Sequence, residues 1–189
     1  MVWIYTEEIV NNNIIKILHT GRVAHGKGQI DAIKACDILV KNNINFELNL
    51  VGSIDKSYNN SFLKFYNSCK YKEKINIIGF KSNISPYLQE ADIFLFPSYG
   101  EGFGNSFAEA LTSNLICIAY ANTSFFNFKN LGFYFLMVKN KDIKDLKNNL
   151  LFVSLNIDSE EIKTKNNHEL ALTLFSTSQE IKKYLEILV

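Results

Sequence analysis

The chain has 189 residues, 47% of them hydrophobic, and a formal net charge of +1. This length fits one packed domain, and the balanced charge argues against a broadly basic surface for nucleic acid. The sequence contains no run of 18 apolar residues, so no transmembrane helix is predicted. Residues 1–13 lack the basic start and the apolar run of a secretory signal. Three widely spaced cysteines without a CxxC pair favour the cytoplasm, with a peripheral place at the inner membrane face left open.

Short apolar runs alternate with segments of helical spacing along the first half of the chain. Strands are predicted at 14–19, 46–51 and 75–78, each followed at once or soon by a glycine. Helices are predicted at 28–41 and 58–71, where apolar residues recur every three or four positions.

The same alternation continues in the second half. In order, the predictions are a short helix at 85–89, a strand at 93–96, a helix at 105–113, a strand at 115–119, a sixth strand at 133–138, a helix at 142–153 and C-terminal helices from about 160 to 189. Strands separated by helices are typical of a Rossmann-like α/β domain, a parallel sheet with helices on both faces. We therefore assign 1–13 to an extension or linker and 14–189 to one domain, whose ligand should bind at the carboxyl ends of the strands.

The loop after the first predicted strand carries two cations. Arg22 and Lys27 flank a glycine-containing turn that leads into a helix at Gly28. A helix N-terminus favours an anion, and arginine and lysine both bind phosphate, the former through its fork and the latter as a compact charge. The order of residues is neither a Walker loop nor GxGxxG. Taken alone, this motif leaves an ordinary turn with solvated cations as an equal alternative.

The loop after the fourth predicted strand is rich in glycine. Three glycines between 100 and 104 let the backbone approach a ligand closely. Glu101 lies in this loop, and Glu109 lies about one turn into the following helix. Carboxylates accept hydrogen bonds from hydroxyl groups. Both the sugar and the ribose of a nucleotide sugar carry such hydroxyls. The alternative is that both glutamates are solvated, Glu109 being favoured simply because it lies near a helix N-terminus. The presence of both loops at one edge of the sheet argues for the ligand site.

Together these motifs resemble the C-terminal domain of the retaining glycosyltransferases of family 4, the group 1 glycosyltransferases, which have the GT-B fold. The matching stretches are Gly21-Arg22 with Lys27-Gly28, Val51-Gly52, Ile78-Gly79-Phe80, the run from Ala91 to Ser98, and the run from Glu101 to Ala110. The last contains the family's two glutamates, separated by seven residues. The resemblance covers about residues 14–153.

The resemblance implies a role for each matching residue. The diphosphate would be bound by Arg22 and Lys27, and the ribose by Glu109. The transferred sugar would be bound by Glu101 with help from N–H groups of Gly102, Phe103, Gly104 and Asn105. Gly21 is also counted among the substrate-binding residues. The base would lie beside Gly79, Phe80 and Lys81, where we expect the aromatic ring to pack rather than to stack. Catalysis is assigned to Arg22, Lys27 and Glu101, the cations stabilising the leaving diphosphate; neither glutamate is assigned as a nucleophile.

The resemblance also implies the reaction, the transfer of a hexose from a nucleotide diphosphate sugar to a hydroxyl with retention. The acceptor would be a glycan or lipid-linked sugar in bacterial surface polysaccharide or lipopolysaccharide synthesis. Because such enzymes bind the acceptor mainly with a second, N-terminal domain, we expect a missing acceptor domain or a partner chain. A non-catalytic module that binds a nucleotide sugar or a partner stays open, and a sugar-nucleotide epimerase of the same architecture has less motif support.

Residues 120–126 depart from the family pattern. They contain no glycine and no acid, whereas the family carries a glycine-rich stretch with a glutamate there. We therefore expect the loop near the donor sugar to differ from that of the family.

No metal site and no cofactor are expected besides the substrate. The three histidines share no ligand spacing, and no Asp-x-Asp sequence is present. We interpret His19 as a hydrogen-bonded strand residue, and His25 and His168 as exposed ones. The cysteines Cys36, Cys69 and Cys117 fall in apolar patterns typical of a core.

Overall fold

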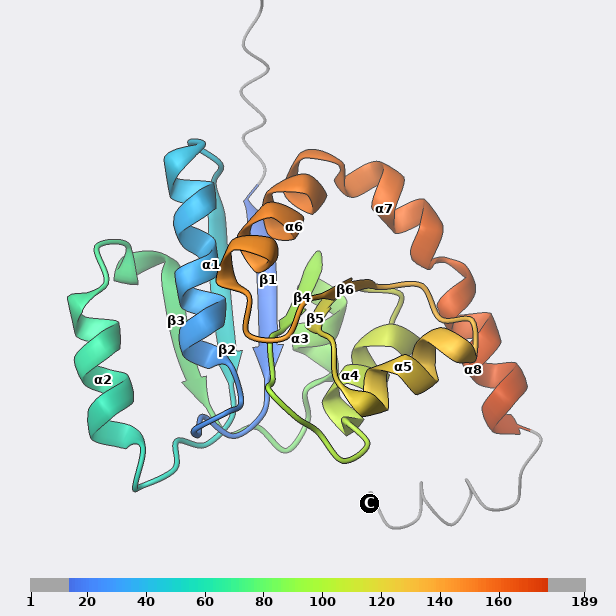
Figure 1. Ribbon diagram of the computed structural model, residues 1–189, viewed down its shortest axis with the longest axis horizontal. Helices are drawn as coiled ribbons and strands as arrows, with labels where there is room; N and C mark the ends of the chain where they lie inside the picture. Colours follow the sequence, from blue (N-terminus) through green and yellow to red (C-terminus); the bar gives the residue numbers. More distant parts are fainter. Residues whose placement is uncertain (1–13, 177–189) are drawn as a thin grey trace, which may run out of the picture.

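Six parallel strands form one sheet, in the order β3-β2-β1-β4-β5-β6, in the computed structural model, which describes residues 14–176 (Figure 1). The strands are β1 (Ile15–Thr20), β2 (Phe46–Val51), β3 (Ile75–Gly79), β4 (Ile93–Phe96), β5 (Ile116–Tyr120) and β6 (Leu136–Val138). After β3 at one edge, the chain returns to the centre and pairs β4 with β1. Such a switch point leaves a crevice outside the carboxyl ends of the two strands, where ligands of open α/β sheets bind.

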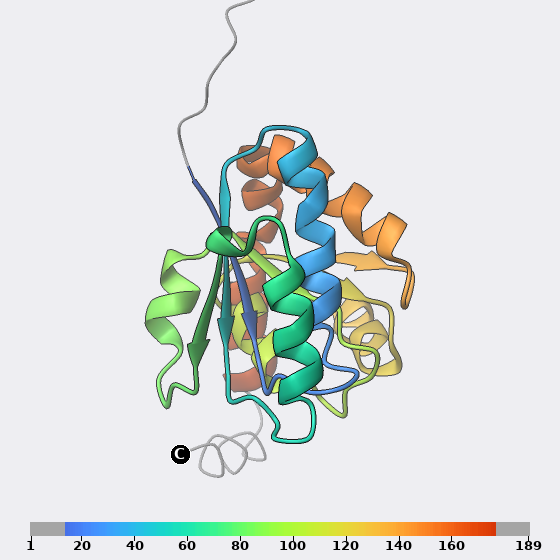
Figure 2. The same ribbon diagram turned by 90° about the vertical axis from the view of Figure 1, so that its left-hand side faces the viewer.

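Helices cover both faces of the sheet. They are α1 (Gln29–Lys41), α2 (Asn59–Ser68), the 3-10 helix η1 (Lys72–Lys74), α3 (Ser85–Glu90), α4 (Asn105–Thr112), α5 (Thr123–Asn130), α6 (Ile143–Leu155), α7 (Ile157–Thr164) and α8 (Asn166–Ser176). Buried residues of α1, α2 and α6 pack on one face, and those of α3, α4, α5 and α8 on the other. Figure 2 shows α1 and α2 on one side of the sheet and α3 on the opposite side. The predicted Rossmann-like class is thereby confirmed.

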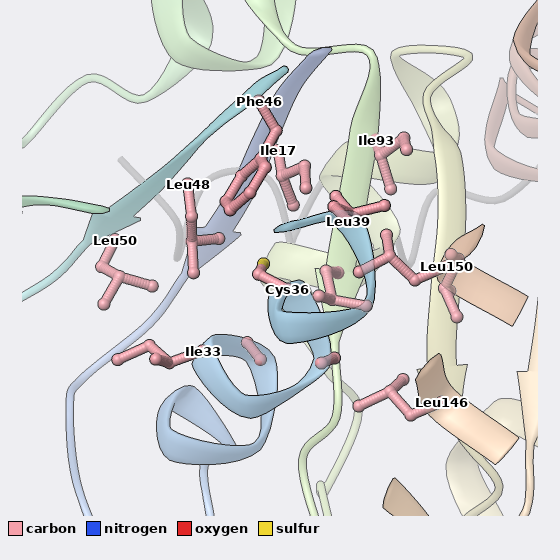
Figure 3. Close-up of a cluster of buried hydrophobic side chains, with 14 of the residues drawn as sticks. Ile17, Ile33, Cys36, Leu39, Phe46, Leu48, Leu50, Ile93, Leu146 and Leu150 are labelled. Carbon is pink, nitrogen blue, oxygen red and sulfur yellow. The ribbon is translucent and has the colours of Figure 1, made fainter. Parts of the chain in front are cut away.

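The strands at the centre of the sheet are apolar on both faces because helices cover both. Every residue of β4 and of β5 is buried. On the α1 side, Figure 3 shows Ile17 and Ile93 of the sheet with Leu39 of α1 and Leu146 and Leu150 of α6.

The opposite core is aromatic. The ring centroid of Phe107, on α4, lies 4.3 Å from that of Phe125 on α5 and 5.0 Å from that of Phe135. Aromatic contacts of this kind add to the stability that burial provides. They fix α4, and with it the loop before α4, against the sheet.

Two predicted elements differ clearly in their bounds from the structure, and one observed helix was not predicted. The sixth strand begins only at Leu136, because Phe133 and Phe135 are buried in the aromatic core rather than paired along the whole predicted run. The predicted helix 58–71 ends at Ser68 and is followed by η1. The helix α5 was not predicted at all.

The termini limit two other predictions. The predicted extension 1–13 and the last part of the predicted C-terminal helices, 177–189, lie outside the described residues. Within the described part, the C-terminal helices begin at Ile157, three residues before the predicted start, and no helix there is long and apolar enough to cross a bilayer.

Candidate functional site

The loops that follow β1 and β4 are fastened to each other at the switch point of the sheet. The backbone N–H of Tyr99 donates to the carbonyl of Gly26 at 2.8 Å. The fully buried hydroxyl of Ser98 lies 3.3 Å from the same carbonyl and 3.2 Å from that of Gly100. These contacts fix the relative position of the two loops before any ligand is considered.

Gly28, the N-cap residue of α1, lies tightly against Pro97 at the end of β4. Its φ of +83° lies in the left-handed region, and a Cβ there would stand 2.0 Å from the carbonyl oxygen of Pro97. Only glycine fits both requirements. The sequence thus brings the start of α1 directly against the end of β4.

A cleft of about 480 Å³ opens between these loops. Its lining residues are His19, Thr20, Gly21, Arg22, Lys27, Phe96, Glu101, Gly102, Phe103, Gly104, Asn105 and Ser106. The structure therefore brings Arg22, Lys27 and Glu101 together, as the sequence predicted. The last two lining residues form the first turn of α4, so the positive end of that helix also faces the cleft.

Lys27 and Glu101 form a bidentate ion pair in the cleft. The Nζ atom lies 3.0 Å from Oε1 and 2.8 Å from Oε2. The side chains are 34% and 10% exposed, respectively, so the pair is less screened than an ordinary surface pair. An anion entering the cleft must share the lysine with this carboxylate.

Arg22 is the more accessible cation. Its side chain is 62% exposed, and its Nη1 atom lies 3.5 Å from Oδ2 of Asp55. Hydrogen bonds from Ser57 are the main cause of a lowered pKa at Asp55, and the guanidinium adds to the effect. Arg22 thus has a loose partner that a phosphate can replace.

His19 lies in the floor of the cleft at the end of β1. Its Nε2 atom lies 3.0 Å from the carbonyl oxygen of Lys27, which confirms a hydrogen-bonded histidine. Burial lowers its pKa to about 4, so the ring is neutral at pH 7. The sequence indicated only a hydrogen-bonded strand residue at this position, so the place of His19 in the lining of the cleft was not predicted.

Tyr99 links the glycine-rich loop to α1. Its hydroxyl donates to Oδ2 of the buried Asp31 at 3.0 Å, and the hydroxyl of Tyr120 donates to the same oxygen at 3.1 Å. Burial first, and the charge of Asp31 second, raise the pKa of Tyr99 to about 12. The loop that carries Glu101 is therefore anchored two residues before the glutamate.

Glu109 lies in a second pocket, of about 370 Å³. This pocket is lined by Ser82, Asn83, Ile84, Ser85, Leu88, Glu109, Thr112 and Ser113. Although the side chain as a whole is exposed, partial desolvation of the carboxyl group raises its pKa. The helix α4 borders both pockets, since Asn105 lines the first cleft and Glu109 lines the second pocket. The two residues lie about 6 Å apart along the helix axis.

The stretch Gly79-Phe80-Lys81 lines neither pocket. Phe80 is 73% exposed, so the expectation that its ring packs is wrong. The physical reason is its place directly after β3, which is an edge strand and has a neighbouring strand on one side only. The chain does enter the second pocket directly afterwards, at Ser82.

The helix α5 follows β5 and begins within the stretch 120–126, which contains no glycine and no acid. It is capped by Asn122, whose side chain accepts a hydrogen bond from the N–H of Phe125 at 3.3 Å. The hydroxyl of Ser124 donates to the carbonyl of Glu101 at 2.8 Å and also contacts that of Gly102. The first turn of α5 therefore holds the backbone of the glycine-rich loop in place through these carbonyl groups.

The remaining histidines and cysteines take no part in either pocket. His25 and His168 are exposed, the latter with Nδ1 2.8 Å from the carbonyl of Thr112. Cys36 and Cys117 are buried as expected, whereas Cys69 is only half-buried. Within residues 14–176, no three histidine, cysteine or acidic residues are grouped so as to hold a metal ion.

Comparison with known proteins agrees with this geometry. The family model described as glycosyl transferases group 1 matches residues 6–170. The chain belongs to the group 1 glycosyltransferases. Among relatives of this group 1 domain, the capsular polysaccharide biosynthesis glycosyltransferase CapH of Staphylococcus aureus is 34% identical over 115 residues, which are 58% of this chain and 32% of CapH.

Solved structures of group 1 and related enzymes share its fold. Anabaena HepE, crystallised with UDP and glucose, superposes with a TM-score of 0.75 at 17% identity, over 92% of this chain and 48% of HepE. The C-terminal domain of the group 1 family protein LpcC from Francisella tularensis gives a TM-score of 0.68 at 19% identity, over 84% of this chain and 85% of that domain. The group 1 domain thus has the architecture of one half of a GT-B glycosyltransferase and spans about half of HepE and a third of CapH.

Proposed function

We propose that this chain is the donor-binding part of a glycosyltransferase that uses a nucleotide diphosphate sugar. The observation that carries the proposal is the convergence of Arg22, Lys27 and Glu101 on one cleft at the N-terminus of α4. Cations and free backbone N–H groups suit a diphosphate, and a carboxylate suits sugar hydroxyls. The presence of UDP and glucose in crystals of HepE supports the same class of ligand.

The two pockets suggest how such a donor lies. The diphosphate binds Arg22, Lys27 and the N–H groups of 102–105, and Glu101 accepts hydrogen bonds from the transferred sugar. The second pocket takes the nucleoside, with Glu109 on the ribose hydroxyls and the base beside the stretch 79–81, which leads into this pocket. A ligand that spans both pockets crosses the first turn of α4, where negative charge is favoured.

The proposed reaction transfers a hexose to a hydroxyl with retention of configuration. As the bond between the anomeric carbon and the diphosphate breaks, negative charge grows on the phosphate oxygens. Arg22, Lys27 and the loop N–H groups stabilise this charge without a resident metal ion. Loss of one such preorganised donor typically costs about 10²–10³ in rate.

The acceptor, a glycan or lipid-linked sugar, would bind residues beyond this domain, in an N-terminal domain or a partner chain. The pathway would be bacterial surface polysaccharide synthesis, supported by the name of CapH, with lipopolysaccharide synthesis as the related case.

Calorimetric titration with UDP, GDP, ADP and their hexose conjugates tests the proposal. The wild-type chain should bind one of these families, and the double variant Arg22→Ala/Lys27→Ala should lose most of that affinity while its circular dichroism spectrum stays unchanged. Lys64→Ala removes an exposed cation on α2 and should leave binding unchanged. A wild-type chain that binds none of the nucleotides refutes the proposed function.

A second candidate is a module that binds a nucleotide sugar without turnover, because the groups that line the cleft suit donor binding by themselves. A transfer assay with and without a candidate acceptor-binding chain separates the two. Sugar transfer in either mixture supports the enzyme, whereas tight binding without transfer in both supports the module.

A further inference from the structure

The hydroxyl of Thr20 is buried beside the cleft without a hydrogen-bond partner. Thr20 is the last residue of β1, is 2% exposed and lines the cleft. Its Oγ1 atom has no partner among the described residues. A buried unsatisfied polar group costs about 1–3 kcal/mol, whereas an apolar side chain of the same shape carries no such cost. A hydroxyl kept at this position therefore calls for a ligand.

Buried polar atoms without a partner occur at the edge of the sheet where the cleft opens, and two of the residues that carry them, His19 and Thr20, line the cleft. Within residues 14–176 the buried side-chain atoms without a partner are His19 Nδ1, Thr20 Oγ1, Gln29 Oε1 and Asn122 Nδ2. All four residues lie at the carboxyl ends of β1 and β5 or at the start of α1. Buried polar groups are normally paired, so their concentration here marks this edge as adapted to something other than packing.

The alternation of the strand places the Thr20 side chain on the face that α4 covers. Side chains two residues apart share a face, and Leu18 belongs to the aromatic core together with Phe107 of α4. Val51, which lies opposite Thr20 in the register of β1 and β2, belongs to the same core. The Thr20 hydroxyl is thus directed to the side of the sheet where α4 begins.

That side of the cleft is suited to an anion. The first turn of α4 has backbone N–H groups without intrahelical acceptors and carries the positive end of the helix dipole. Arg22 lies two residues beyond Thr20 and lines the same cleft. Because Thr20 lines the same cleft as these donors, its hydroxyl can serve as one more hydrogen-bond donor to an anion.

We propose that Thr20 is a ligand-contact residue whose hydroxyl donates a hydrogen bond to a phosphate oxygen of the donor diphosphate. This inference rests on the proposed function and adds to it a neutral donor that the group 1 motif does not contain. The hydroxyl has no hydrogen-bond partner among the described residues, and a phosphate oxygen becomes its partner when the diphosphate binds.

Substitution of Thr20 tests this with two readouts, using whichever of UDP, GDP and ADP binds the wild-type chain most tightly. Thr20→Val keeps the shape and removes the hydroxyl, so affinity should fall about tenfold, the lower end for a hydrogen bond to a charged group. The melting temperature of the ligand-free variant should stay the same or rise. Thr20→Ser keeps the hydroxyl and should bind within about threefold of wild type.

Thr164→Val is the matched control. Thr164 is equally buried, but its hydroxyl oxygen lies within hydrogen-bond distance of two carbonyl oxygens, 2.7 Å from that of Asn114 and 2.9 Å from that of Glu161. This variant should melt at a lower temperature by a few degrees and bind the nucleotide as wild type does.

Each other outcome overturns the inference. Unchanged affinity in Thr20→Val, with a wild-type chain that binds, refutes the contact and leaves the proposed function intact. A melting temperature lowered as in Thr164→Val shows a structural hydroxyl instead. A wild-type chain that binds no nucleotide refutes the proposed function, and this inference with it.

Discussion

At the scale of single residues, Lys27 and Glu101 act as each other's counter-ion. If the lysine binds diphosphate and the glutamate binds sugar, Glu101→Gln should affect two ligands differently. Release of Lys27 should raise the affinity for the bare nucleoside diphosphate about two- to fivefold, the value of a modest ion pair. The affinity for the nucleotide sugar should fall, because the amide is a weaker acceptor.

Parallel calorimetric titrations with the two ligands measure this difference. Glu90→Gln serves as the control, since Glu90 is 69% exposed and pairs with Lys16 outside the cleft. Equal changes for both ligands in Glu101→Gln would contradict the separate roles.

The buried imidazole of His19 makes stability depend on pH. Its pKa is 6.5 in the unfolded chain and about 4 in the folded one, so between these values the unfolded state binds a proton that the folded state does not. The free energy of unfolding should therefore fall as the pH falls through this window, by about 2 kcal/mol between pH 7.5 and pH 5. Urea denaturation at the two pH values measures the loss.

Two variants isolate the histidine that is responsible. His19→Gln should show a smaller loss between the same pH values, and His25→Gln, which alters an exposed residue, should behave as wild type. If His19→Gln loses as much stability as wild type, another group causes the effect.

At the scale of elements, the contact between the start of α1 and the end of β4 holds the two loops in place. Gly28→Ala would set a Cβ 2.0 Å from the Pro97 carbonyl in a left-handed conformation. The variant should lose at least about 1–3 kcal/mol of stability and, because the loops separate, nucleotide affinity as well. Urea denaturation and calorimetry check both effects. Gly100→Ala, with an ordinary φ and open space, should be nearly neutral in both.

The elements also show what a single sequence predicts. The strand β4 was predicted with its observed bounds because four apolar residues run directly into Pro97. The helix α5 was missed because the resemblance suggested a loop, although Asn122 followed by Phe125 and Phe128 at helical spacing is a helix-start signal. The bounds of β6 depended on whether Phe133 and Phe135 belong to the strand or only pack into the core before it. The periodicity of apolar residues does not distinguish these two cases.

For the site, the motifs were sufficient to predict the first cleft. They did not predict the separate pocket of Glu109 or the exposure of Phe80, because both depend on the path of the loop after β3. The motifs also did not predict that His19 and Thr20 line the cleft, since their neighbours along β1 are core residues.

At the scale of the whole molecule, the aromatic core joins α4, α5 and the sheet. Phe107 is fully buried at its centre, so Phe107→Ala should lower the free energy of unfolding by about 3–5 kcal/mol. Phe126→Ala, at a 50% exposed residue of α5, should change it by less than about 0.5 kcal/mol. Urea denaturation compares the two. Similar losses in both variants would show that this core does not hold the fold together.

The contacts of Ser124 have a consequence for the electrostatics of the glycine-rich loop. In a trans peptide unit the carbonyl and the N–H point in opposite directions. The hydroxyl of Ser124 contacts the carbonyl oxygens of Glu101 and Gly102, so these oxygens point toward α5. The amide hydrogens of Gly102 and Phe103 therefore point away from that helix. Both residues line the cleft. One serine thereby orients two peptide dipoles in advance, so that an arriving anion meets partial positive charge rather than lone pairs.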